Sequence, residues 1–226
     1  MDYKVLVQGN NLALKNGFLG LSSIVLIRTP NGPVLFDTGH HTTRPALLAG
    51  LQAEGLSPAD VPTVILSHLH FDHANNIDLF PQASIYLSAR EFAYAADPHP
   101  EDMFVPAMIR EQVSRMNLTL LEEEGEVVPG LRWIPAPGHT PGLISLVLEH
   151  EEAGRVVLAS DAIKYAKEAV TGRCDLAFDT PETGTRTIQR ILAMADRIVP
   201  GHFPELIKRD GVWTWDEAAE VTLLVR

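Results

Sequence analysis

Short apolar runs separated by turn residues mark the first third of the chain. Runs rich in β-branched residues predict four strands, over Lys4–Gln8, Ser23–Arg28, Pro33–Asp37 and Thr63–Ser67. The dipeptide Asn31-Gly32 is typical of a tight hairpin turn between the second and third of them. A mixed apolar pattern over Arg44–Glu54, closed by Gly55, predicts a helix.

The same alternation of strands and helices continues to the end of the chain. Further strands are expected at Ser84–Leu87, Gly125–Val128, Leu131–Pro135, Ser145–Glu149, Arg155–Ser160 and Ile198–Val199, with the fourth and fifth of these forming a hairpin. Helices are expected from about Ala74, from a capping box at Ser88–Glu91, from Pro181 behind its cap Thr180, and over Asp216–Leu224. An apolar stripe on the third of these helices, Ile188, Ile191, Leu192 and Ala195, predicts core packing.

Strands in both halves of the chain with helices between them favour an α/β architecture of two sheets covered by helices on their outer faces. Residues 97–117 are the least regular stretch, because Pro98, Pro100 and Pro106 interrupt any long helix. This stretch is expected to contribute to a pocket or to a dimer contact, and the sequence does not choose between them. No repeat or linker divides the chain, so residues 1–226 are predicted to form one domain.

Composition narrows the classes of function. The net charge of −11 argues against a broad nucleic-acid interface, which needs clustered Lys and Arg. No apolar run is long enough to span a membrane, and the N-terminus lacks the pattern of a signal peptide. The single Cys174 allows no internal disulfide. A cytoplasmic protein acting on a small molecule is expected, and a homodimer stays open.

The densest chemistry follows the predicted strand Thr63–Ser67. His68, His70, Asp72 and His73 stand within six residues, and imidazole with carboxylate is a ligand set for zinc, iron or manganese. On an extended backbone His68 and His70 point to the same side, whereas Asp72 and His73 face another direction. One segment can therefore serve two metal ions.

Three later residues also follow apolar strands directly. They are His139 after Trp133–Pro135, Asp161 after Val156–Ser160, and His202 after Ile198–Val199. A glycine precedes each of these two histidines and allows the backbone to turn sharply and approach its neighbours closely. Each site alone is weak, but their shared position at strand ends predicts one metal centre.

In this order the segments resemble the metallo-β-lactamase superfamily. The matching motifs are His-x-His-x-Asp-His at 68–73, Gly-His at 138–139, Asp161, Gly-His at 201–202 and Asp37-Thr38-Gly39. The resemblance implies an αββα sandwich with two divalent cations, zinc in the first place and iron or manganese as alternatives. It implies one cation on His68, His70 and His139, a second on Asp72, His73 and His202, and Asp161 as the bridge.

Within the superfamily the chain is most similar to the N-acyl homoserine lactonases. The segments that carry this likeness are Ser67–Ala74, Glu126–Gly130 and Pro137–Gly142. In those enzymes a tyrosine soon after the bridging aspartate touches the substrate carbonyl. Tyr165 matches it only with one inserted residue, because Lys164 occupies the unshifted position. The connection from Gly39 to Thr63 is short for the group.

The implied reaction is the opening of a lactone or related carboxylic ester. Two cations acidify a bridging water to hydroxide near neutral pH and polarise the carbonyl. The resemblance implies catalytic roles for Asp72, as a proton shuttle, and for Tyr165, as a hydrogen-bond donor to the oxyanion. Asp37 is expected to orient a ligand histidine. His40 and His41 are candidates for the pocket wall, and His99 and His150 for the surface.

Other activities use the same residues. A phosphodiesterase or nuclease needs the same two-cation centre, and a persulfide dioxygenase needs a single iron on a subset of the ligands. A glutathione-thioester hydrolase is disfavoured, because only 24 residues follow His202. Nothing in the sequence favours a non-catalytic metal-binding protein. Metal content separates the dioxygenase from the hydrolases.

Overall fold

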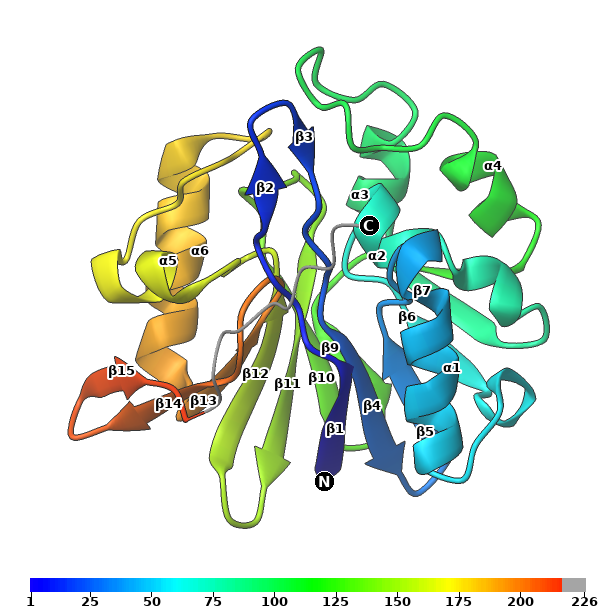
Figure 1. Cartoon of the computed structure of the whole chain (residues 1–226), viewed down its shortest axis with the longest axis horizontal. Coiled ribbons are helices and arrows are strands. Elements are labelled where there is room, and N and C mark those ends of the chain that lie inside the picture. Colours follow the sequence, from blue (N-terminus) through cyan, green and yellow to red (C-terminus); the bar gives the residue numbers. More distant parts are fainter. Residues whose placement is uncertain (217–226) are drawn as a thin grey trace, which may run out of the picture.

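Two β-sheets pack face to face in the computed structural model, which describes residues 1–216 (Figure 1). The first sheet has six strands in the order β1-β4-β5-β6-β7-β8. Their bounds are Asp2–Val7, Ile24–Thr29, Gly32–Phe36, Thr63–Ile65, Ser84–Ser88 and Asn117–Leu121. The strands β5 to β8 run parallel to one another, whereas β1, β4 and β5 are joined antiparallel.

The second sheet has seven strands in the order β15-β14-β13-β12-β11-β10-β9. In chain order β9 to β15 span Gly125–Val128, Leu131–Pro135, Ile144–His150, Gly154–Ser160, Arg197–Pro200, Leu206–Arg209 and Val212–Thr214. Strands β11 and β12 form the predicted hairpin, with Leu146 opposite Leu158. A separate two-stranded hairpin joins β2 (Ala13–Leu14) to β3 (Gly17–Phe18).

A core of apolar side chains fills the space between the sheets. Phe36 and Ile65 from the first sheet and Trp133, Leu146 and Leu158 from the second belong to one buried cluster. Each is at most 3 % exposed. Burial of this inner face supplies the main driving force for joining the two sheets.

Helices cover both outer faces. Against the first sheet lie α1 (Arg44–Ala53), α2 (Phe71–Ala74), α3 (Ala89–Tyr94) and α4 (Ile109–Ser114), and against the second lie α5 (Ala166–Thr171) and α6 (Pro181–Met194). The predicted stripe on α6 packs on that sheet, where Ile188 and Ile191 are fully buried. The predicted αββα sandwich is therefore confirmed.

Several boundaries differ from the sequence predictions. The helix expected from Ala74 starts at Phe71 and so includes Asp72 and His73, and a 3₁₀ turn at Ile77–Leu79 follows it. The hairpin β2–β3, strand β8 and hairpin β14–β15 were not predicted, because these are short and their exposed positions weaken the apolar pattern. The helix predicted over Asp216–Leu224 lies outside the described residues except for Asp216 itself.

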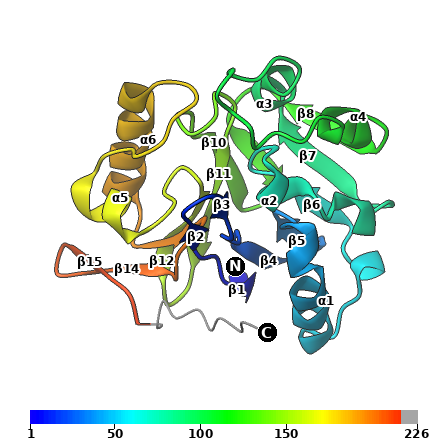
Figure 2. The ribbon, with the colours of Figure 1, turned by 45° about the horizontal axis from the view of Figure 1, so that its top comes forward.

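Parallel pairing brings the ends of several strands to one edge of the sandwich. Strands β5 and β6 end together in the first sheet, and β12 and β13 end together in the second. The β2–β3 hairpin and α2 stand at this same edge (Figure 2). Among residues 1–216, no helix combines the length and apolar character needed to cross a bilayer.

Candidate metal centre

Four segments at this edge carry the seven ligand-type residues that the sequence singles out. The loop after β6 carries His68 and His70 and runs into α2, which carries Asp72 and His73. The loops after β10, β12 and β13 carry His139, Asp161 and His202. Because all three of these strands belong to the second sheet, their loops approach the first sheet's segment from the opposite side.

The seven side chains meet in three overlapping groups. The groups are His68, His70 and His139; His68, His73 and Asp161; and Asp72, His73 and His202. Within each group the ligand atoms lie within 4.8 Å of one another. None of the seven residues is more than 4 % exposed. The predicted convergence of distant segments is confirmed.

Asp161 lies between the outer groups and turns one oxygen to each. Its Oδ2 is 3.2 Å from His139 Nε2. Its Oδ1 is 3.3 Å from His73 Nε2 and 3.2 Å from His202 Nε2. A carboxylate placed in this way can bind two cations with separate oxygens.

Asp37 fixes the ring of His73. Its Oδ2 accepts a hydrogen bond from His73 Nδ1 at 2.8 Å, which leaves Nε2 facing Asp161. The same carboxylate accepts bonds from Ser67 N and Oγ at 2.7 and 2.8 Å and from Ser160 Oγ at 3.0 Å. Asp37 has the left-handed φ of 61°, which aspartate tolerates better than most residues. The predicted orienting role of Asp37 is confirmed.

Other partners fix two further rings. His70 donates from Nε2 to Asp102 Oδ2 at 3.0 Å, so Nδ1 faces the centre. His202 donates from Nδ1 to the carbonyl oxygen of Leu21 at 3.0 Å. The Asp102 contact was not predicted, since it comes from the irregular stretch 97–117 and only the fold brings it to His70.

The polar atoms of the centre fit cations better than they fit one another. His68 Nε2, His73 Nε2 and Asp161 Oδ1 are buried without a hydrogen-bond partner among the described residues. His139 Nε2 lies 3.1 Å from His70 Nδ1, whose ring already donates from its other nitrogen. Buried atoms left in this state cost free energy unless a ligand pairs with them. Imidazole and carboxylate donors of this kind suit zinc, iron or manganese.

Charges within the centre shift its ionisations strongly. Burial opposes an ionised Asp161, but His202, His73 and His139 outweigh it and hold the pKa of Asp161 well below its ordinary value. Burial likewise opposes protonation of His73, yet Asp161 and Asp72 raise the pKa of His73 well above 6.5. Asp161 similarly raises the pKa of His202 against the effect of burial. A cation that binds here must displace these protons.

Glu91 is a buried carboxylate that the sequence pattern misassigned. Ser88 caps α3 as predicted, accepting bonds from the backbone N–H groups of Arg90 and Glu91. The Glu91 side chain does not complete the capping box. Its carboxylate instead accepts from Leu69 N at 3.0 Å and from Thr140 Oγ1 at 2.7 Å. It thereby joins the His68–His70 loop to the His139 loop.

Four phenylalanines form an apolar rim beside the centre. Phe18 comes from β3, Phe71 from α2, and Phe104 and Phe178 from loops. The ring centroids of Phe71 and Phe104 are 6.3 Å apart and stacked, and that of Phe178 is 5.8 Å from both the His70 and the His139 ring. This apolar rim was not predicted, because its members are scattered singly along the sequence.

The two residues near the lactonase tyrosine position differ in their surroundings. Lys164 is buried and its Nζ lies 2.7 Å from Glu168 Oε1. Tyr165 is half-buried, and its hydroxyl donates to Asp175 Oδ2 at 2.5 Å. Burial and that hydrogen bond raise the pKa of Tyr165.

The remaining candidates lie farther out. His40 has its ring centroid 5.0 Å from that of Phe71 and so adjoins the apolar rim, with His41 beside it at 5.9 Å. His99 is exposed, as predicted. Cys174 is partly buried.

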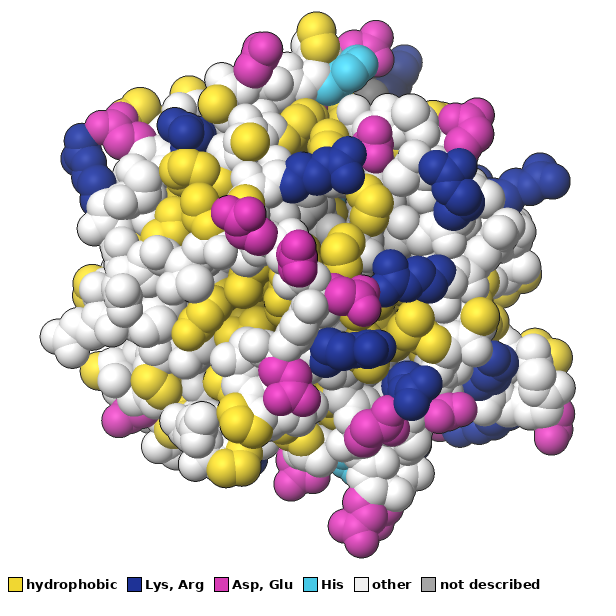
Figure 3. Space-filling view, turned by 180° about the vertical axis from the view of Figure 1, so that it is seen from behind, with side chains coloured by type: hydrophobic (Ala, Val, Ile, Leu, Met, Phe, Trp, Pro, Cys, Tyr) yellow, Lys and Arg dark blue, Asp and Glu magenta, His cyan; other side chains and the backbone are white. Residues whose placement is uncertain are grey.

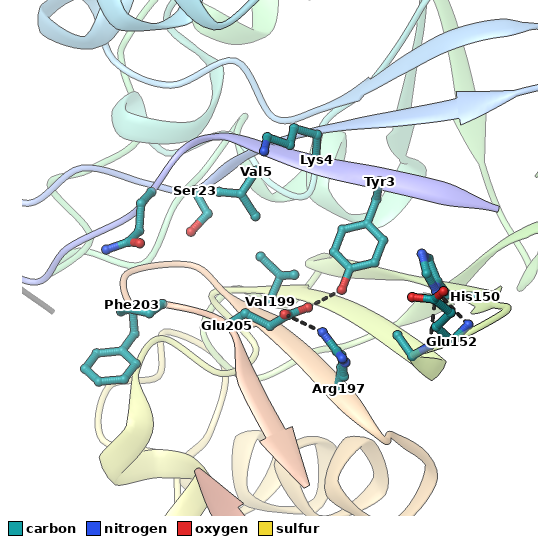
Figure 4. Close-up of a pocket in the computed structure, with 13 residues that line it drawn as sticks. Tyr3, Lys4, Val5, Ser23, His150, Glu152, Arg197, Val199, Phe203 and Glu205 are labelled. Carbon is teal, nitrogen blue, oxygen red and sulfur yellow. Dashed lines mark hydrogen bonds and ion pairs between the residues drawn. The ribbon is translucent and has the colours of Figure 1, made fainter. Parts of the chain in front are cut away.

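His150 lines a separate cavity of about 300 Å³ between β1 and the β13–β14 junction (Figure 4). There the Glu205 carboxylate accepts hydrogen bonds from Tyr3 Oη and from Arg197 Nη1, the latter at 3.1 Å. The charge of Glu205 is therefore already paired. His150 is half-buried instead of lying on the surface as predicted.

Comparison with known proteins agrees with the geometry. The N-acyl homoserine lactonase of Bacillus thuringiensis is 30 % identical over 198 residues, which cover 77 % of this chain and 76 % of the lactonase. Metallo-beta-lactamase domain-containing protein 1 of Rattus norvegicus is 33 % identical over 184 residues, or 81 % of this chain and 66 % of that protein.

Solved structures share the fold. A quorum-quenching N-acyl homoserine lactone hydrolase superposes with a TM-score of 0.67 at 27 % identity, covering 84 % of each chain. A protein of Thermotoga maritima described as a metallo-beta-lactamase gives a TM-score of 0.72 at 21 % identity over 91 % of this chain and 98 % of its own, which shows the fold alone.

The predicted resemblance to the lactonases is confirmed by these relatives. The sequence model of the Metallo-beta-lactamase superfamily matches residues 17–215, which include all seven ligand-type residues. The chain belongs to the Metallo-beta-lactamase superfamily.

Proposed function

We propose that this chain is a two-cation hydrolase that opens lactones or related carboxylic esters. The observation that carries the proposal is the placement of Asp161, whose two oxygens each lie within 3.3 Å of a histidine nitrogen from a different group. One cation is assigned to His68, His70 and His139, and the other to Asp72, His73 and His202, with Asp161 shared. Zinc suits these donors best, with iron or manganese as alternatives.

The cations, when bound, supply Lewis acidity and a water acidified towards neutral pH. The protein's own groups hold and move protons around them. Asp72 Oδ2 is 3.4 Å from His202 Nε2 and 3.8 Å from His73 Nε2. We assign to Asp72 the transfer of a proton to the leaving oxygen of the ester.

Tyr165 is assigned to the substrate carbonyl on the resemblance to the lactonases. Its hydroxyl is a hydrogen-bond donor, which the developing oxyanion needs. Its present partner is Asp175, so this role requires the hydroxyl to exchange Asp175 for the substrate.

The substrate is a small acyl compound. The apolar rim of Phe18, Phe71, Phe104 and Phe178 offers aromatic surface to a hydrocarbon chain beside the cations. Relatives at 30 % identity are N-acyl homoserine lactonases, whose name specifies an acyl group on a lactone. We place this activity in the cytoplasm, without a membrane or nucleic-acid partner. Whether the chain forms a homodimer is measured by analytical ultracentrifugation.

Phosphoesters are the second candidate substrate, because the same ligand set can hold two cations for phosphoryl transfer. The surface disfavours a polynucleotide. Over the face seen in Figure 3, Lys and Arg side chains alternate with Asp and Glu, and the net charge of the chain is −11.

Turnover of a substrate panel tests the proposal. The zinc-loaded protein is expected to open acyl lactones and aryl esters faster than it cleaves a bis-aryl phosphate, and to leave a persulfide unoxidised. Faster cleavage of the phosphate would replace the proposal with a phosphodiesterase. Oxidation of the persulfide by a protein holding one iron would replace it with a dioxygenase.

A further inference from the structure

A buried ion pair outside the ligand set lies at the start of α5. Lys164 Nζ and Glu168 Oε1 are 2.7 Å apart, and their side chains are 7 % and 0 % exposed. A buried ion pair stabilises a fold only when further hydrogen bonds satisfy its remaining atoms, and an apolar pair would often serve stability as well. The contacts of this pair suggest what it does instead.

Glu168 joins two segments of backbone. Its Oε2 accepts from Lys164 N at 2.7 Å, and its Oε1 accepts from Asp175 N at 2.9 Å as well as from the Lys164 ammonium. One carboxylate therefore fixes the turn after Asp161 against the loop before α6. Both of its oxygens are used.

Each of these segments continues directly to residues of the metal centre. Lys164 O accepts from His202 N at 2.7 Å, and Lys164 follows Asp161 by three residues. Leu176, next to Asp175, places its carbonyl oxygen 3.4 Å from His139 Nδ1. Farther along the same loop, Phe178 N donates to His139 O at 2.9 Å.

The charges of the pair also suit a cationic neighbour. Burial opposes the charged ammonium, but Glu168 and Asp161 outweigh it and raise the pKa of Lys164. An unpaired ammonium beside two divalent cations would repel them. Glu168 neutralises it, so the segment is held without that electrostatic cost.

We infer that the Lys164–Glu168 ion pair is a positioning unit that holds His139, Asp161 and His202 in the geometry that binds cations, an inference that rests on the proposed two-cation centre.

Zinc affinity of the metal-free protein tests this, measured by competition with a chromophoric chelator. Glu168→Gln removes one of the two acceptor oxygens and leaves Lys164 unpaired, and is expected to weaken zinc binding about 10- to 100-fold. The matched control is Glu205→Gln. Glu205 follows His202 by three residues and pairs with Arg197 and Tyr3. Among residues 1–216 its side chain forms no hydrogen bond with another ligand loop. The zinc affinity of the Glu205→Gln variant is expected to stay within about threefold of that of the unmodified protein.

A second variant and a second readout separate positioning from folding. The double variant Lys164→Met with Glu168→Gln removes the unpaired charge and is expected to fold, as followed by circular dichroism, yet to bind zinc about tenfold more weakly than the unmodified protein, because the turn and the loop are no longer joined. With Co²⁺ bound, both variants are expected to change the visible absorption bands, and Glu205→Gln to preserve them. Unchanged zinc affinity and Co²⁺ spectra in the double variant, or equal losses in the control, would overturn the inference. These readouts need no substrate, so they stand apart from the test of lactone opening.

Discussion

At the scale of single residues, the centre depends on side chains that orient ligands as much as on the ligands. Each ring nitrogen that faces the centre has a partner on its opposite nitrogen, such as Asp37 for His73 and Asp102 for His70. These partners determine which nitrogen carries the lone pair. Asp37 was predictable because it stands in a motif at the end of a strand. Asp102 was not, because no local pattern links it to a histidine 32 residues earlier.

Replacing Asp37 tests the orienting role. Asp37→Asn keeps the size of the side chain but removes the charge that stabilises the His73 Nδ1–H, and zinc affinity is expected to fall about 10- to 100-fold by chelator competition. Asp78→Asn is the control, because Asp78 forms an exposed ion pair with Arg44. Equal zinc affinities in the two variants would show that Asp37 does not orient His73 for metal binding.

The pKa shifts predict opposite pH responses for metal binding and for the metal-free fold. His73 has a folded pKa raised above its ordinary 6.5, so its stabilising charge interactions are fully present below pH 6.5 and are lost as the pH rises through the folded value. Zinc competes with that proton, so zinc affinity is expected to increase over the same rise in pH. Urea unfolding of the metal-free protein and zinc titrations, each at several pH values, measure both trends. If stability and zinc affinity changed in the same direction with pH, the predicted competition between zinc and the His73 proton would be wrong.

Tyr165→Phe tests the assigned contact with the substrate. Loss of a donor to the oxyanion is expected to lower kcat for an acyl lactone by about 100-fold with little change in zinc affinity. An unchanged kcat would show that the hydroxyl serves only its bond to Asp175.

At the scale of elements, helix α6 approaches the His139 loop so closely that two glycines meet. A Cβ on Gly138 would lie 2.2 Å from Gly184 Cα, and Gly138 has a φ of +143°. A Cβ on Gly201 would lie 1.9 Å from Asp161 Oδ1. The sequence predicted close approach at the glycines before His139 and His202, and the structure confirms it. The partner Gly184 was not predicted, since only packing of α6 brings it there.

Gly138→Ala measures the importance of this approach. Crowding against α6 is expected to lower the free energy of unfolding by about 1–3 kcal/mol more than Gly172→Ala does. Gly172 is the matched control, because it also has a positive φ, 63°, but has open space around its Cβ position. Urea denaturation gives both values. Equal losses would mean that backbone conformation alone explains the glycine.

The apolar rim is assembled from elements that periodicity did not reveal. Phe18 lies on the unpredicted hairpin β2–β3, and Phe104 lies in the irregular stretch 97–117. Phe104 has its ring centroid 5.5 Å from that of His70, so the stretch adjoins the centre. Phe104→Ala is expected to raise KM about tenfold for a long-chain acyl lactone and to leave a short-chain one nearly unchanged. Equal effects on both substrates would argue against an acyl-binding rim.

At the scale of the whole molecule, the sandwich brings together ligands that are separated by up to 134 positions, from His68 to His202. The sequence predicted the two layers, the strands that precede each ligand and all seven members of the cluster, because each signal is local. The apolar rim and the buried hydrogen bonds of Glu91 and Glu168 depend on contacts between distant loops. Only the folded chain defines those contacts.

Metal stoichiometry tests the central claim most directly. Protein purified without chelators and equilibrated with zinc, then freed of unbound metal, is analysed by inductively coupled plasma mass spectrometry. The account predicts two zinc ions per chain, falling to one or none in Asp161→Asn. A single ion per chain that is unaffected by Asp161→Asn would contradict it.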